Sequence, residues 1–181
     1  MSSALSGGRN HRRGPTPVAT GPRQVVQMDT IMFGELYAFT AIDIYTKEAD
    51  IMMAPVLTAA YGSAFLERAL ALRFDGWVEL IQTDGGSEFK ETFAQQVLSY
   101  CQRHRVARPY KKNEQAYIES FNRTVRKECL GWLNYRSEDL IECQQNSEEF
   151  LYRYHYHRPH LSLGMEPPLR RGGQALSDIY G

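Results

Sequence analysis

The fold is decided by residues 24–45, which read QVVQMDTIMFGELYAFTAIDIY. Both halves of this stretch are rich in β-branched, aromatic and other apolar residues, which favour strands. Gly34 and Glu35 separate the two halves and form a turn signal. The stretch therefore predicts two adjacent strands joined by a short hairpin, with an acid, Asp29, inside the first strand.

The pattern of apolar residues predicts the elements that follow the hairpin. Thr58 is a good N-cap for a helix whose apolar residues recur at helical spacing as far as Leu72, and Ser87 caps a later helix. The predicted elements are a strand over 49–56, a helix over 58–74, a strand over 77–84, a helix over 87–100 and a short strand over 106–109.

Two more helices complete the predicted elements. The first, AYIESFNRTVRKECLGWL, carries one apolar stripe that includes Ile118 and Phe121. The second begins at about Ser137 and runs through Ile141 to a His-Arg-Pro-His turn at 157–160. Three strands followed by alternating helices and strands predict the α/β class, with three layers around a mixed sheet.

The chain has the size of one domain with tails. It has 181 residues, enough to bury one core. Residues 1–23 are rich in Ser, Gly, Pro and Arg and hold almost nothing to bury, which is typical of a flexible basic arm or linker. We expect a globular core over 24–168 and a C-terminal tail over 169–181.

Charge is balanced over the whole chain but unevenly distributed. The formal net charge is zero, which by itself disfavours a nucleic-acid partner. Lys and Arg nevertheless crowd residues 103–127, where the only acids are Glu114 and Glu119. A local basic field is therefore predicted.

Cysteine usage and hydropathy narrow the class further. Cys101, Cys129 and Cys143 are odd in number and show no CxxC spacing, so we expect plain buried or half-buried thiols. No stretch approaches the roughly eighteen apolar residues that a membrane helix needs. We expect a soluble, intracellular protein.

Three acids occupy positions where surface acids are not expected. Asp29 lies inside an apolar strand, Asp84 ends a strand before two glycines, and Glu119 lies on an apolar helix. A charge inside a central strand costs several kcal/mol unless it is paired or binds a metal. At about 100° per residue, Glu119 points away from the apolar stripe, toward the side of Arg123 and Arg126.

Two Asp and one Glu without a matching His or Cys set form an all-oxygen site, which suits Mg²⁺ or Mn²⁺ rather than Zn²⁺. Two such ions allow water or a DNA 3′-hydroxyl to attack a phosphodiester in line. Spacing alone leaves this open, because three acids scattered along a domain are common.

Five separate motifs resemble a known family: QMDTI with FTAIDIYTKEA, IQTDGGSEF, NEQAYIESFNRTVRKECL and YHYHRPHLSLGMEPP. They are similar to the integrase core of bacterial insertion-sequence transposases, relatives of retroviral integrases in the DDE superfamily. The resemblance runs from about Val25 to Pro168. It implies a ribonuclease H-like three-layer α/β/α fold with a five-stranded mixed sheet, in a protein of the bacterial cytoplasm.

The resemblance implies a function and a catalytic triad. The function is metal-dependent DNA cleavage and 3′-hydroxyl strand transfer by a polynucleotidyl transferase. Asp29, Asp84 and Glu119 are the implied catalytic residues and ligands of two Mg²⁺ or Mn²⁺ ions. The resemblance implies DNA contacts for Arg123 and Arg126, and it implies that Asn122 orients Glu119 or a DNA phosphate. Lys111 and Lys112 are expected to contact DNA phosphates as well, because Lys and Arg supply the sequence-independent part of DNA affinity.

Other polar residues are expected to be structural. The resemblance places Asp43 as a structural acid near the end of the second strand, and Glu114 is interpreted as an exposed loop acid. His155, His157 and His160 lack the paired cysteines of a zinc site, so the turn they surround is expected to pack at the end of the core.

Complete transposases of this type carry an N-terminal helix-turn-helix recognition region, which nothing before residue 24 resembles. The chain is therefore expected to be an excised core, a protein whose recognition half is encoded separately, or a decayed remnant. The partners expected are DNA ends, target DNA and at least one further copy of the core. Two alternatives stay open: a ribonuclease H-like nuclease, and an inactive integrase-like DNA-binding module.

Overall fold

The computed structural model describes residues 15–111 and 113–169, which form one five-stranded sheet. The strand order is β3-β2-β1-β4-β5. β1, β2 and β3 are antiparallel, whereas β4 and β5 run parallel to β1. The strands are β1 (Val25–Phe33), β2 (Leu36–Asp43), β3 (Ala49–Ala54), β4 (Val78–Thr83) and β5 (Cys101–Val106).

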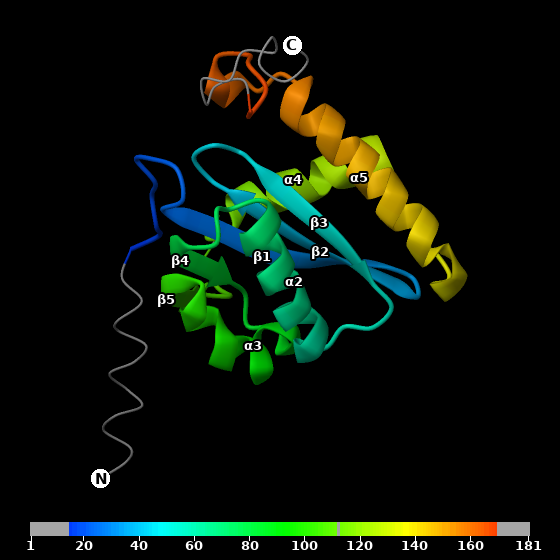
Figure 1. The fold of residues 1–181 in the computed structure, drawn as a ribbon, viewed down its shortest axis with the longest axis horizontal. Helices are drawn as coiled ribbons and strands as arrows, with labels where there is room; N and C mark the ends of the chain where they lie inside the picture. The colour runs from blue at the N-terminus through cyan, green and yellow to red at the C-terminus, as the bar shows by residue number, and fades with distance from the viewer. Residues whose placement is uncertain (1–14, 112, 170–181) are drawn as a thin grey trace.

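Helices cover both faces of this sheet (Figure 1). α2 (Ala59–Leu72) and α3 (Thr92–Gln96) bury apolar residues on one face, while α4 (Ala116–Val125) and α5 (Leu140–Tyr156) bury theirs on the other. Each face therefore has its own apolar core. The predicted three-layer α/β/α fold with a mixed sheet is confirmed.

α2 begins where the sequence predicts it and lies close to the turn after β4. The Thr58 hydroxyl accepts a hydrogen bond from the Tyr61 N–H at 3.3 Å, as expected of an N-cap. A Cβ on Gly62 would lie 2.1 Å from the Glu88 carbonyl oxygen, so only glycine permits this approach. Leu72, predicted on the apolar stripe, is 67% exposed, although Leu70 and Phe74 on either side of it are buried in the core.

The segment between β4 and the loop before α4 differs from the prediction. The helix expected over 87–100 is broken into a 3-10 turn (Ser87–Phe89), α3 and a second 3-10 turn (Val97–Ser99). The predicted helix is interrupted at Glu91, whose φ is +50°. Ser87 does not cap a helix, because it is the first residue of the 3-10 turn. The last strand consequently begins at Cys101, so the strand predicted over 106–109 is wrong; parallel pairing with β4 sets the true register.

The two C-terminal helices are present as predicted. α4 continues into a π-helical turn (Arg126–Leu130) that ends at Gly131, where φ is +69°. A 3-10 turn (Ser137–Asp139) leads into α5. Ile141, expected in the apolar face of this last helix, is 70% exposed, whereas its neighbour Leu140 packs against the core.

Other features of the described chain agree with simple expectations. Cys101 and Cys143 are buried free thiols and Cys129 is half-buried, as predicted. No helix among the described residues is long and apolar enough to cross a membrane. Most of the predicted arm over 1–23 and nearly all of the tail over 169–181 lie outside the described residues, so both stay predictions.

Candidate active site

Parallel pairing of β1 with β4 brings two of the predicted acids to adjacent strands. Gln27 pairs with Gln82 in the register of the two strands. Asp29 and Asp84 each follow two residues later, so they leave neighbouring strands at the same end of the sheet. Asp29 is half-buried inside β1, whereas Asp84 is exposed just beyond β4.

Buried amides attach the start of α4 to these same strands. The Gln27 side chain accepts a hydrogen bond from the Ile118 N–H at 3.0 Å, in the first turn of the helix. Gln82 donates to Gln115 Oε1 at 2.9 Å, and Gln115 donates to the Met28 carbonyl at 3.2 Å. Because all three glutamines are buried, this network fixes the helix against the strands that carry the acids.

The third acid faces the same region from α4. Glu119 lies in the first turn of α4 and is exposed, and it lines a cavity of about 360 Å³ together with Asp84. Arg108, Lys111 and Glu114 also line this cavity, and Arg108 is paired with Glu114 there. Asp29, Asp84 and Glu119, far apart in sequence, thus meet at one end of the sheet.

Asp29 is held by an amide rather than by a cation. Asn122 Nδ2 donates to Asp29 Oδ2 at 3.0 Å, and the Thr40 hydroxyl donates to Asn122 Oδ1 at 2.8 Å. Burial is the largest cause that raises the pKa of Asp29 to about 6; the negative charges of Asp84, Glu88 and Glu119 contribute to the rise, and a hydrogen bond from the Thr30 backbone acts against it. The resemblance predicts that Asn122 orients Glu119 or a phosphate; in this structure it orients Asp29.

Glu88 is a fourth acid that sequence reasoning missed. It is buried, and its carboxylate accepts a hydrogen bond from the Thr30 hydroxyl, next to Asp29, at 2.9 Å. A Cβ on Gly86 would lie 2.5 Å from Glu88 Oε2, so this glycine leaves room for the carboxylate. The signal in the sequence is the acid between Gly86 and Phe89, which periodicity alone assigns to a solvated turn.

Glu114 is not the exposed loop acid that the sequence predicts. It is only 2% exposed, and it accepts hydrogen bonds from Arg105 at 2.8 Å and Arg108 at 2.6 Å. These guanidinium groups, Arg105 first, hold the pKa of Glu114 well below its usual range. Two cations make the burial of this carboxylate possible. The same pairing removes Arg105 and Arg108 from the basic field predicted over 103–127.

The predicted DNA-contacting cations differ in their environment. Arg123 is exposed one turn after Glu119 on α4, and Lys111 is exposed beside the cavity. Arg126 is partly buried instead: its guanidinium lies 4.7 Å from the Phe33 ring centroid and donates to the Met32 and Gly131 carbonyls. Lys112 lies outside the described residues.

The remaining polar residues have structural partners. Asp43 is fully buried and accepts hydrogen bonds from the backbone of Tyr45 and Thr46 and from Arg23, which confirms a structural acid at the end of β2. His155 is also buried, and its Nε2 accepts from the Ala49 N–H at 3.0 Å. His160 lines a cavity on another side of α4.

The acids are near one another but not in a closed coordination shell. Within the described residues, no group of three His, Cys, Asp or Glu side chains is close enough to hold a metal ion in this conformation. None of the ion pairs among these residues involves Asp29, Asp84, Glu88 or Glu119. The four carboxylates thus concentrate negative charge that the described side chains do not neutralise by ion pairing.

Known proteins resemble this chain in sequence and in fold. Two family models, each described as an integrase core domain, match residues 19–112 and 100–168. The chain belongs to the integrase core domain family. This integrase core is 31% identical over 133 residues to the "Insertion element IS476 uncharacterized 39.2 kDa protein" of Xanthomonas euvesicatoria, a match that covers 71% of the chain and 37% of that protein.

A second curated relative has a similar origin. The "Insertion element IS407 uncharacterized 31.7 kDa protein" of Burkholderia multivorans is 29% identical over 156 residues, covering 81% of the integrase core and 54% of the relative. The chain therefore spans about half or less of the length of these two proteins. Its resemblance to the insertion-sequence type of integrase core is shown by both.

Solved structures show the same fold. The simian T-cell lymphotropic virus intasome in complex with PP2A regulatory subunit B56 gamma contains a chain that matches with a TM-score of 0.68 at 17% identity, over 91% of this chain and 59% of that one. The catalytic core domain of BIV integrase matches with a TM-score of 0.63 at 13% identity, over 88% and 99%. The ribonuclease H-like fold of the integrase core is thereby shown.

Proposed function

We propose that this integrase core cuts DNA strands and joins their 3′-hydroxyl ends to target DNA. The observation that carries the proposal is the meeting of Asp29, Asp84 and Glu119 at one end of the sheet. These acids come from two adjacent parallel strands and a helix that buried glutamines fix to those strands. Phosphoryl transfer needs little from a protein besides such positioned charge.

The donor atoms fit hard divalent cations. Every candidate ligand is a carboxylate oxygen, which suits Mg²⁺ or Mn²⁺. The negative charge around Asp29, which adds to the effect of burial in raising its pKa, would be relieved by a bound cation. Asp29, Asp84 and Glu119 would hold two such ions, which supply charge neutralisation at the attacking and leaving oxygens of the phosphodiester.

The proposed reaction is two successive displacements at phosphorus. In cleavage, a water oxygen bonds to phosphorus as the bond to the 3′ oxygen breaks; the water loses a proton and the 3′ oxygen gains one. In joining, that 3′-hydroxyl attacks a target phosphodiester, forming one P–O bond as another breaks. The number of phosphodiesters is unchanged by joining, so the step needs no external energy source.

The chain's own residues would orient this reaction. Asn122 holds one oxygen of Asp29, so the other remains directed away from the amide. Glu119 projects from the first turn of α4 into the cavity shared with Asp84. Arg123, exposed one turn later, would contact the DNA backbone, with Lys111 and Lys112 as further cations of the loop.

The chain matches only part of the length of its two curated relatives. Because the chain spans 37% and 54% of the two curated proteins, recognition of specific DNA ends is proposed to reside in a separate helix-turn-helix region. Joining two ends to one target also requires more than one core, so we propose a homo-oligomer of at least two copies.

One observation favours a second candidate, a ribonuclease H-like nuclease. Such enzymes generally use a fourth acid, and Glu88 lies beside Asp29, bonded to Thr30. A nuclease would release cut strands without joining them. The products of a single assay therefore separate the two candidates.

The test is a strand-transfer and disintegration assay with labelled branched DNA and Mn²⁺. We expect joined product from the parent chain and none from Glu119→Gln. Glu67→Gln, which removes an exposed acid from α2, is the matched control and should keep full activity. Cut but unjoined strands would favour the nuclease. If no product formed from parent protein that folds and binds DNA, the inactive-module alternative would replace the proposal.

A further inference from the structure

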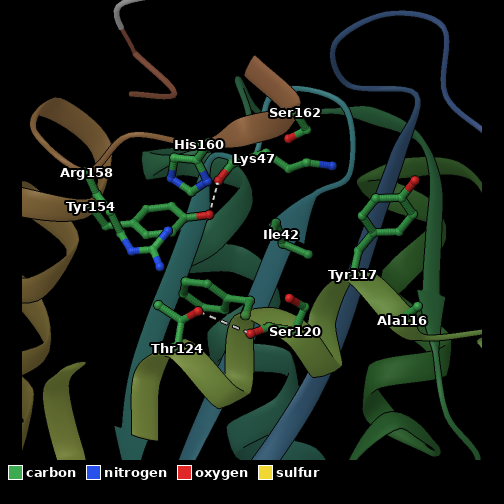
Figure 2. Close-up of a pocket in the computed structure, with 11 residues that line it drawn as sticks. Ile42, Lys47, Ala116, Tyr117, Ser120, Thr124, Tyr154, Arg158, His160 and Ser162 are labelled. Atoms are coloured by element: carbon green, nitrogen blue, oxygen red, sulfur yellow. Dashed lines mark hydrogen bonds between the residues drawn. The ribbon is translucent and has the colours of Figure 1, made fainter. Parts of the chain in front are cut away.

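A second polar cavity lies against α4 (Figure 2), and Glu119 is not among the residues that line it. Its volume is about 400 Å³, and the floor is formed by Ser120 and Thr124 of α4. The turn between β2 and β3 and the end of α5 form the walls. Among the described lining residues there is no Asp or Glu.

Three basic side chains line this cavity: Lys47, Arg158 and His160. The Lys47 ammonium lies 4.1 Å from the Tyr117 ring centroid and donates to the Ile44 carbonyl, so it is held at the rim. Arg158 donates through Nε to Glu128 at 2.9 Å. An arginine carries five N–H donors, so this pair leaves further donor capacity on the guanidinium.

His160 supplies an independent observation. Its Nε2 atom is buried and has no hydrogen-bond partner in the structure, which is uncommon for a buried polar atom. The pKa of His160 is lowered to about 4, first by burial and then by the positive charges of Arg158 and Lys47. Arg158 and Lys47 therefore place positive charge near the ring, which a bound anion would neutralise.

Hydroxyl side chains also line the cavity. Ser120 and Ser162 lie on opposite sides of it, and the Thr124 hydroxyl donates to the Ser120 carbonyl at 3.3 Å, so Ser120 supplies the α4 hydroxyl for a phosphate oxygen. Hydroxyls together with Lys and Arg are the usual protein contacts to the nucleic-acid backbone. Ser120 also follows Glu119 directly, so a strand in this cavity would lie beside the strand at the proposed active site.

We propose that the cavity formed by Lys47, Arg158, His160, Ser120 and Thr124 binds a backbone phosphate of DNA, separately from the Arg123 side of α4. This inference rests on the proposed function, because that function supplies the DNA. The strand bound here would be held on the neighbouring side of the helix that carries Glu119. Together the two sides of α4 would fix the helix between phosphates.

The first arm of the test follows the imidazole of His160 by NMR in the full chain. We expect duplex DNA to shift the His160 resonances and to raise its pKa, with His160→Asn used for assignment. Inorganic phosphate is the second probe. If His160 responds to inorganic phosphate but not to DNA, the cavity is a free-phosphate site and the DNA assignment is overturned. DNA binding without any change at His160 overturns it as well.

The second arm measures DNA affinity against salt for Lys47→Gln/Arg158→Gln. We expect several-fold weaker binding and a log–log salt slope that is smaller by about 0.9 for each DNA phosphate that the variant no longer neutralises. Arg153→Gln, which removes an exposed cation from the same helical region as Arg158 outside the cavity, is the matched control. Equal slopes for the double variant and this control would overturn the proposal.

A further variant and the activity of the parent chain distinguish failure of the phosphate site from failure of the proposed function. If the double variant does not fold, Thr124→Glu places an anion in the cavity from a helical position and should weaken DNA binding several-fold; unchanged binding would overturn the proposal. A parent that binds DNA through this cavity but yields no joined product would refute the proposed function alone. A parent that binds no DNA refutes both.

Discussion

Glu114 and Asp29 are two buried or half-buried carboxylates at the same end of the sheet, and their surroundings are opposite. Glu114 has two guanidinium partners, which hold its pKa well below the usual range. Asp29 has an amide partner and three acidic neighbours, and burial raises its pKa to about 6. Among the described residues, two cations pair with Glu114 and none pairs with Asp29. This difference supports the proposal that Asp29 binds a cation from outside the chain.

The largest expected effect on stability is at Glu114. Glu114→Gln leaves Arg105 buried without its carboxylate, and breaking a buried ion pair costs about 3–5 kcal/mol. Urea unfolding monitored by circular dichroism measures this loss. The same change at an exposed acid, Glu67→Gln, serves as the control and should be nearly neutral. A loss of unfolding free energy below about 1 kcal/mol would show that the ion pairs of Glu114 do not stabilise the fold.

A divalent cation bound by the acids around Asp29 should stabilise the folded protein. Binding to the folded state alone adds about 2.7 kcal/mol when the free ion is a hundredfold above its dissociation constant. We expect Mn²⁺ to raise the melting temperature of the parent and calorimetric titration to detect its binding. Both effects should be absent in Asp84→Asn. Equal binding by the two proteins would remove Asp84 from the proposed ligands.

The pH dependence of stability should also distinguish Asp29 from Glu114. Asp29 has a pKa of about 6 in the folded state against 3.8 as its ordinary value, so the folded state binds the proton more tightly. Stability from this group is therefore present below pH 4 and is lost as the pH rises toward 6. Without metal, Asp29→Asn should stabilise the protein by about 3 kcal/mol at pH 7.5 and by almost nothing at pH 3.5.

Denaturant unfolding at the two pH values, with chelator present, checks this prediction. Asn122 donates to Asp29, and the carbonyl oxygen of an asparagine can accept the same bond, so the substitution preserves the contact. Destabilisation of Asp29→Asn at pH 7.5 would mean that the carboxylate is satisfied by the protein, as Glu114 is.

The smallest expected effect concerns the cations around the acids. Arg123 is exposed and none of the described ion pairs involves it, whereas Arg126 is packed on Phe33. Arg123→Gln should weaken DNA binding several-fold and reduce the salt slope by about 0.9, with little change in stability. Arg126→Gln should lower the melting temperature instead. Fluorescence anisotropy over a salt series and thermal unfolding distinguish the two residues.

The elements that depend on neighbouring residues in the chain could be predicted from the sequence alone. The hairpin around Gly34, the N-cap at Thr58 and the apolar stripe of Ile118 and Phe121 follow from turn chemistry and periodicity. The strand that carries Asp29 could be read in the same way, because an acid in an apolar strand stands out. The family motifs added the expected triad of acids.

Tertiary structure decided the partners of each polar side chain. Glu114 reads as a loop acid because the residues that bury it, Arg105 and Arg108, approach only when the loop folds onto β5. Glu88 reads as a turn residue until α2 presses Gly62 against its backbone. Local sequence sets the backbone states that a segment prefers, but the cost of burying a charge depends on neighbours that folding brings from distant parts of the chain.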